Sequence, residues 1–165
     1  MRKTSAWPLS QLCVALIVYA SLYPFDQWRD QGIAPWEFLT APWPKYWTGF
    51  DVVANVLGYA PLGFFLTLSA MRMGWRGRVV LWCTLAASLL SFALEGLQSY
   101  LPARVPSQTD FLLNTLGAWL GAVLASALEH LGLLNHWSQF RARWFVRDSH
   151  LALVLISVWP AALLF

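Results

Sequence analysis

Charged residues are scarce in this chain. Only 12% of its 165 residues are Asp, Glu, Lys or Arg, whereas 58% are hydrophobic and eleven are Trp. An average soluble domain carries about twice that share of charged residues. The scarcity excludes an ordinary soluble domain and predicts an integral membrane protein. The net charge of +3 does not indicate nucleic-acid binding, because the basic residues lie in short clusters between apolar runs, as membrane topology signals do.

Cysteine is nearly absent as well. Cys13 and Cys83 are the only two, and each falls inside an apolar run, so the sequence predicts neither a disulfide framework nor a thiolate metal site. The chain also lacks a nucleophile elbow, a glycine-rich phosphate loop and a zinc-ligand motif. These absences weigh against the well-known catalytic machineries. Whether the protein is an enzyme stays open at this point.

Hydropathy predicts an all-α bundle that crosses a membrane several times. Four apolar runs, 7–25, 51–70, 79–100 and 110–130, each have about the twenty residues that a helix needs to span a bilayer. Residues 1–131 would form this transmembrane domain. Residues 132–150 are basic and aromatic, typical of a cytoplasmic interfacial helix. The short apolar run 151–165 predicts either a fifth span of a longer natural chain or a tail on the membrane surface.

Basic residues predict the orientation in the membrane. Because they are enriched on the cytoplasmic side of membrane proteins, their distribution places the N-terminus in the cytoplasm. The first run is predicted to stay uncleaved, since it continues into bulky Tyr23 and Phe25 without a small-residue cleavage site. The cytoplasmic set is Arg2, Lys3, Arg72, Arg76, Arg78, Arg141, Arg143 and Arg147, against Arg29, Lys45 and Arg104 outside.

A short polar motif occurs twice, at the outer start of two predicted spans. Both copies read [ST]xxDxxxNxxG, which favours a parallel repeat of two helical hairpins. Each Ser/Thr-x-x-Asp start is also a capping box, so both Asp residues have an explanation as helix caps. The Asn residues, one turn deeper, suit either ligand binding or hydrogen bonding between helices. The copies are Thr48, Asp51, Asn55 and Gly58, and Ser107, Asp110, Asn114 and Gly117.

Glu95 is an acidic residue deep inside an apolar run. A carboxylate in hydrocarbon is costly, so Glu95 is a candidate functional residue. It belongs to a polar face that repeats at helical spacing and should meet neighbouring helices. We expect one outer cavity lined from three spans. Its candidate acid/base or cation-binding residues are Glu95, Asp51 and Asp110, and its candidate ligand-binding residues are Asn55, Ser91, Gln98, Arg104 and Asn114.

Small residues and one proline predict how the helices pack. Gly117 and Gly121 lie four residues apart, a spacing that lets membrane helices approach closely. Gly58, Pro61 and Gly63 fall in the second span, where the proline is expected to kink the helix. We interpret all five as structural. The outer loop 26–50, rich in Trp and Pro, reads as an aromatic belt or as a lid over the site.

Several runs resemble the blocks that define the VanZ-like family of membrane proteins. They are DVVANVLGYAPLG (51–63), SFALEGLQ (91–98), Arg104 and DFLLNTLGAWLG (110–121), within a resemblance that covers roughly residues 10–131. The resemblance implies a multi-pass protein of the bacterial inner membrane. It also implies a link to glycopeptide resistance, because the namesake is associated with resistance to teicoplanin. The family positions match Asp51, Asn55, Pro61, Gly63, Ser91, Glu95, Gln98, Arg104, Asp110, Asn114 and Gly117.

Two classes of function remain open from the sequence. In the first, the cavity binds or processes a cell-envelope lipid intermediate, such as a polyprenyl phosphate, or a lipid-like antibiotic, with Arg104 on an anionic head. In the second, the protein is a non-catalytic scaffold or transporter in which Glu95 and Arg104 form a structural pair. Three carboxylates against one Arg favour a divalent cation, a protonated Glu95 or a cationic ligand. Membrane lipids are the expected partners.

Overall fold

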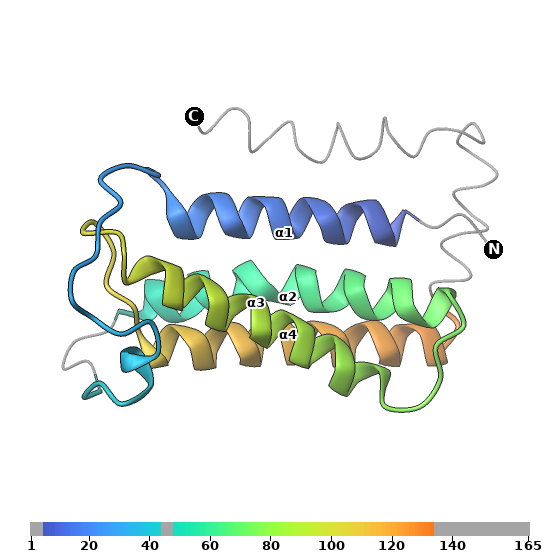
Figure 1. The fold of residues 1–165 in the computed structure, drawn as a ribbon. Helices are drawn as coiled ribbons and strands as arrows, with labels where there is room; N and C mark the ends of the chain where they lie inside the picture. Colours follow the sequence, from blue (N-terminus) through green and yellow to red (C-terminus); the bar gives the residue numbers. More distant parts are fainter. Residues whose placement is uncertain (1–4, 44–47, 134–165) are drawn as a thin grey trace. The chain divides into compact units, whose positions relative to one another are not determined.

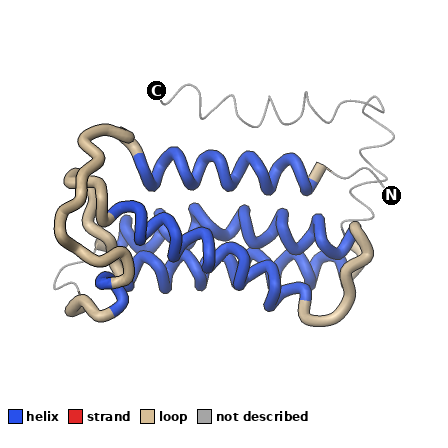
Figure 2. Tube along the Cα trace, viewed as in Figure 1, coloured by secondary structure: helices blue, strands red, loops and turns tan. Residues whose placement is uncertain are grey.

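All regular structure in the described part of the chain is helical. The computed structural model describes residues 5–43 and 48–133, and these hold no strand. The elements are α1 (Ala6–Leu22), the short 3-10 helix η1 (Glu37–Leu39), α2 (Gly49–Arg72), α3 (Val79–Gln98) and α4 (Gln108–His130) (Figures 1 and 2). The predicted all-α class is confirmed for these residues. The predicted linker 132–150 and fifth span 151–165 lie outside them.

Two compact units divide the chain at Ser126. The first unit holds α1, α2, α3 and most of α4, and everything below concerns this unit. The second unit contributes only residues 127–133 to the described part, which complete α4 and the turn after it.

Three of the four predicted spans are long enough to cross a membrane. Helices α2, α3 and α4 have 24, 20 and 23 residues and a mean hydropathy of 1.6 to 1.7 over their most apolar windows. At 1.5 Å per residue they are roughly 30 to 36 Å long, against a hydrocarbon core of about 30 Å. Helix α1 is apolar but has only 17 residues, so the prediction of four full spans is not confirmed for the first run.

The first helix ends early because of Pro24. The run 7–25 was expected to stay helical to Phe25, but α1 ends at Leu22 and Tyr23 has an extended ψ of 135°. A residue that precedes proline is sterically driven away from the helical region, so the chain leaves the helix at Tyr23. The carbonyl groups at this helix end are therefore left for partners from elsewhere in the fold.

Glycines bring α2 and α4 together backbone to backbone. A Cβ added to Gly117 would overlap the carbonyl oxygen of Val56, and one added to Gly121 would overlap that of Ala60. Gly63 of α2 is equally close to the α4 backbone at Ala118. These contacts are of the kind that small residues make possible between membrane helices. Gly58 differs, because an added Cβ would meet nothing within 4 Å.

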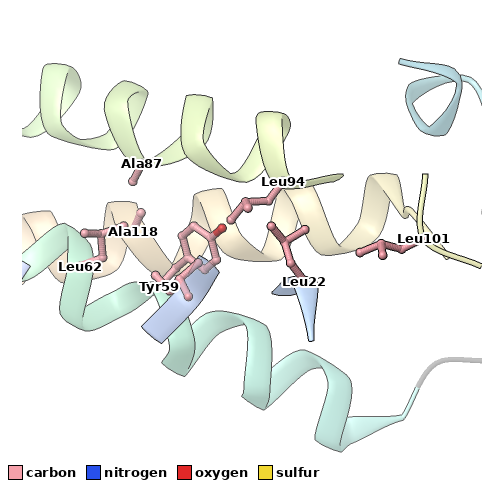
Figure 3. Packing of buried hydrophobic residues seen from close by; sticks show 8 residues of the cluster. Leu22, Tyr59, Leu62, Ala87, Leu94, Leu101 and Ala118 are labelled. Atoms are coloured by element: carbon pink, nitrogen blue, oxygen red, sulfur yellow. The ribbon is translucent and has the colours of Figure 1, made fainter. Parts of the chain in front are cut away.

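The apolar core lies between the four helices, as Figure 3 shows. Its labelled members come from α1, α2, α3, α4 and the turn after α3, and the outward faces of the same helices carry large exposed side chains such as Leu57 and Leu89. Many large apolar side chains exposed on the outer faces of the helices suit contact with lipid better than contact with water. The core cluster includes Ile17, Leu22, Tyr59, Leu62, Ala87, Leu94, Leu101 and Ala118.

The outer loop is fixed to the end of α3 and the start of α4. Phe38 of η1 is buried, with its ring centroid 5.6 Å from that of Phe92 and 6.3 Å from that of Phe111. Gln31 donates a hydrogen bond of 2.7 Å to the carbonyl of Ser99, and the side chain of Gln108 donates one of 2.6 Å to the carbonyl of Ala41. These ties hold the loop against the α3–α4 side of the bundle.

Candidate functional site

A polar cavity of about 430 Å³ lies among the C-terminal half of α1, the N-terminal halves of α2 and α4, and the end of α3 with the loop that follows it. We call it the polar cavity. It contains six of the eight residues that the sequence analysis assigned to the predicted pocket, in a bundle whose outward faces are apolar. The six are Asn55, Glu95, Gln98, Arg104, Asp110 and Asn114.

Glu95 reaches from α3 to the start of α4. Its side chain is only 4% exposed, and its carboxylate accepts a hydrogen bond of 2.8 Å from the backbone N–H of Ser107. Ser107 directly precedes α4, and its own hydroxyl accepts a hydrogen bond of 3.2 Å from the N–H of Thr109. A carboxylate at a helix N-terminus is stabilised by the unpaired N–H groups and the helix dipole. Glu95 therefore caps α4 from a different helix.

The two copies of the polar motif are capped differently. At the start of α2 the capping box is complete, because Thr48 N–H donates to the Asp51 carboxylate at 2.8 Å and Thr48 Oγ1 accepts from Asp51 N–H at 3.2 Å. At the start of α4 Glu95 takes the N–H that Asp110 would otherwise accept. The Asp110 carboxylate instead accepts a 3.2 Å hydrogen bond from Asn55 Nδ2.

This difference gives the two aspartates different hydrogen-bond partners. Asp51 is an exposed helix cap and is not among the residues that line the polar cavity, so the structure does not bring it into the predicted pocket beside Glu95. Its carboxylate stays at the helix start because it is held by the backbone of its own first turn. Asp110 lines the cavity together with Glu95, and its carboxylate is tied to α2 through Asn55.

The two asparagines connect the helices around the cavity. Asn55 also donates to the backbone carbonyl of Asp51 at 3.0 Å. Asn114 donates to Ser91 Oγ of α3 at 3.0 Å, and Ser91 is buried behind it without lining the cavity. The Asn114 carbonyl oxygen Oδ1 is buried and has no hydrogen-bond partner among the described residues. It is an acceptor that still lacks a donor.

The guanidinium of Arg104 is hydrogen-bonded to the end of α1. Its Nε donates to the carbonyl of Tyr23 at 3.1 Å and its Nη2 to that of Ala20 at 2.7 Å. Gln98 supports the same helix end with a 3.0 Å hydrogen bond to the carbonyl of Ser21. The guanidinium thus caps a helix C-terminus, where positive charge is favoured. A direct pair of Glu95 and Arg104 was one expectation, but these two described residues form no ion pair with each other.

Comparison with known proteins identifies the family. A family model described as VanZ/LLP1 matches residues 4–129, which include the polar motifs, Glu95 and Arg104. The chain belongs to the VanZ/LLP1 family. No curated protein and no solved structure matches it. With three helices of membrane-spanning length and composition, this VanZ/LLP1 chain is a membrane protein.

Two features of the site in this VanZ/LLP1 chain were missed from the sequence. Tyr59 of α2 lines the polar cavity and is 4% exposed, with its hydroxyl directed toward α3 near Ser91 (Figure 3). Its spacing of four residues from Asn55 was the available signal. Ser107 was read as part of a motif, whereas its backbone N–H is the group that Glu95 binds.

Two expectations about the site concern a metal and a lid. Residues 5–43 and 48–133 hold no group of three or more His, Cys, Asp or Glu side chains that could bind a metal ion. The described part of the outer loop, up to Trp43, contributes no residue to the polar cavity. The loop packs beside the site, so this part of it does not act as a lid in the conformation described here.

Proposed function

We propose that the polar cavity binds the polar head of an amphiphile of the bacterial cell envelope, either a lipid-linked intermediate or a lipid-like antibiotic. The observation that carries the proposal is the gathering of two carboxylates, three amides and a guanidinium around one space of about 430 Å³. Small-molecule sites in proteins commonly have volumes of about 300 to 1,000 Å³. A space of this size and polarity is unexpected between membrane helices that only pack together.

The chemistry of the cavity favours a head group that donates hydrogen bonds. The carboxylates of Glu95 and Asp110 are acceptors, and Asn114 Oδ1 is a buried acceptor without a partner. A buried acceptor that lacks a donor costs about 1 to 3 kcal/mol, and a ligand hydroxyl or ammonium group would remove that cost. The same carboxylates repel an anionic head, unless its negative charge lies beside Arg104 at the rim.

The direction of access is part of the proposal. The excess of basic residues at the other end of α1, α2 and α3 supports a cytoplasmic N-terminus, and with this orientation the polar cavity would lie in the outer half of the inner membrane. Val105, beside Arg104 at the cavity, is 84% exposed, so an amphiphile can reach the cavity at this rim. A ligand bound there would meet envelope lipids and external glycopeptides, which connects the cavity to glycopeptide susceptibility.

A structural scaffold is the second candidate, and one observation favours it. Most polar groups of the cavity already bond within the bundle, as Glu95 does with Ser107, Asn55 with Asp110, and Arg104 with the end of α1. Under this reading the polar groups serve to join helices, and the cavity holds no specific ligand. The two candidates predict different results for a substitution that removes a charge from the cavity and keeps the hydrogen bonds between the helices.

The substitution Glu95→Gln makes that change. The amide oxygen of Gln can still accept the Ser107 N–H, while the charge facing the cavity is lost. The protein is purified in a mild detergent and the co-purified lipids are identified by mass spectrometry. Asp26→Asn is the control, because it removes a charge from the exposed outer loop outside the cavity.

Binding predicts a defined lipid in the wild type and in Asp26→Asn, reduced at least about tenfold in Glu95→Gln, since a hydrogen bond to a charged group contributes about 1.5 to 3 kcal/mol. Teicoplanin susceptibility should follow the same pattern: cells expressing the wild type and Asp26→Asn should behave alike, and cells expressing Glu95→Gln should differ from both. Identical lipid profiles and identical susceptibility in all three would support the scaffold and reject the binding proposal.

A further inference from the structure

A second and larger hollow lies at the opposite end of the bundle from the polar cavity. Its volume is about 680 Å³, and it is formed by the start of α1, the end of α2, the loop 73–78 and the start of α3. We call it the tryptophan groove, after Trp7, Trp75 and Trp82, which line it from three different elements. Nothing in the proposed function uses this groove, and it has no residue in common with the polar cavity.

The wall of the groove is apolar and aromatic. The three indoles are 51%, 57% and 57% exposed, so each has one side against the protein and another side open. Tryptophan in this state is typical of the boundary between lipid chains and head groups. Along α2 the floor extends from Leu66 to Met73, about 10 Å at the helical rise, which is enough for the first part of an acyl chain.

The rim of the groove is positively charged. Arg76 lines it, and Arg78 follows two residues later in the same loop. The sequence contains no Asp or Glu between residues 52 and 94, so the part of the chain that carries Arg76 supplies no carboxylate to it. Gly74 and Gly77 have φ values of +90° and +64°, and they form the tight turns that set Trp75 and Arg76 at the groove.

We propose that the tryptophan groove binds an anionic phospholipid, with an acyl chain along the α2 floor and the phosphate at Arg76. The charge selects the class of lipid, because the ammonium group of a zwitterionic lipid would face the same basic loop and be repelled by it. The predicted orientation places this end at the cytoplasmic leaflet, whose anionic lipids attract clustered basic residues. The apolar wall and the basic rim therefore recognise two parts of one ligand.

The test compares two lipids with identical acyl chains. The full chain is purified in an uncharged detergent, and binding of phosphatidylglycerol and of phosphatidylcholine is measured by native mass spectrometry. We expect phosphatidylglycerol to bind more tightly. Arg76→Gln should lower that affinity about fivefold, the effect of one basic residue at an anionic lipid, and Arg76→Lys should retain it. Arg29→Gln, which removes an exposed charge at the other end of the bundle, is the matched control and should change nothing.

A second variant tests the groove independently of charge. Ala86 is exposed and lines the groove, so Ala86→Phe should fill it and weaken phosphatidylglycerol binding without unfolding the protein. Equal affinity for the two lipids in the wild type would overturn the proposal. The proposal would also be overturned if neither Arg76→Gln nor Ala86→Phe altered phosphatidylglycerol binding. That result is expected if apolar residues of the chain itself, such as 151–165, fill the groove.

Discussion

The hydrogen bond from Ser107 N–H to Glu95 should make Glu95→Ala far more damaging than Glu95→Gln. The bond is 2.8 Å long and joins the end of α3 to the residue that precedes α4. Alanine leaves that N–H without its acceptor in a largely buried place, which costs about 1.5 to 3 kcal/mol for a charged partner. Glutamine keeps an acceptor and removes a buried charge, so its stability should lie within about 1 kcal/mol of the wild type.

The difference is measurable as thermal unfolding in detergent, followed by tryptophan fluorescence. A loss of about 2 kcal/mol in a chain of this size lowers the midpoint by roughly 4 to 8 °C. Glu37 supplies the control, because its carboxylate accepts the Ala34 N–H at 3.2 Å in an exposed loop, where water replaces a lost acceptor. Glu37→Ala should therefore shift the midpoint much less. Equal midpoints for Glu95→Ala and Glu95→Gln would refute the view that Glu95 caps α4.

Three further predictions concern the neighbours of Glu95. Asp51→Ala should cost about 1 kcal/mol through the lost α2 cap and leave lipid retention unchanged, whereas Asp110→Asn should reduce lipid retention at near wild-type stability. The reverse result would contradict the different roles given to the two aspartates. Gly121→Val should destabilise by at least about 1 to 3 kcal/mol because its Cβ meets the Ala60 carbonyl, while Gly49→Ala, in open space, should not; a stable Gly121→Val would exclude the close α2–α4 contact. Arg104→Met should speed amide hydrogen exchange at residues 19–25 but not in the middle of α4, and Arg29→Met should do neither; unchanged exchange would show that Arg104 does not hold the end of α1.

The long apolar helices could be predicted from composition, and their outer ends could not be predicted equally well. Runs of apolar residues predicted α2, α3 and α4 to within a few residues, because hydropathy and span length are set by the bilayer. The first run was predicted too long since its hydropathy continues past Tyr23, whereas the steric effect of Pro24 ends the helix.

The same motif gave different structures because capping depends on what lies nearby. The spacing of Ser107 and Asp110 predicts a local capping box as well as that of Thr48 and Asp51 does. Only the structure shows that the Ser107 N–H donates to the Glu95 carboxylate and not to that of Asp110. The Asp110 carboxylate accepts a hydrogen bond from Asn55 instead. Two hairpins that repeat in sequence would therefore differ in function, and the parallel repeat itself stays a prediction.

Arg104 illustrates a partner that leaves no pattern in the sequence. Its acceptors are backbone carbonyls of Ala20 and Tyr23, and every residue carries such a carbonyl. A side chain of opposite charge can be sought in a sequence, which is why Glu95 was the expected partner. Gly117 and Gly58 show the same limit, because equivalent motif positions face the α2 backbone in one case and the polar cavity in the other.

The most direct test of the central claim fills the polar cavity without touching any of its polar groups. Gly58 lines the cavity and has open space beside it, so Gly58→Leu should place an apolar side chain there and keep the fold. If the cavity binds an amphiphile, the mass of the purified Gly58→Leu protein should lack the bound lipid found on the wild type, at an unchanged or higher unfolding temperature. A folded Gly58→Leu protein that retains the same lipid would contradict the account.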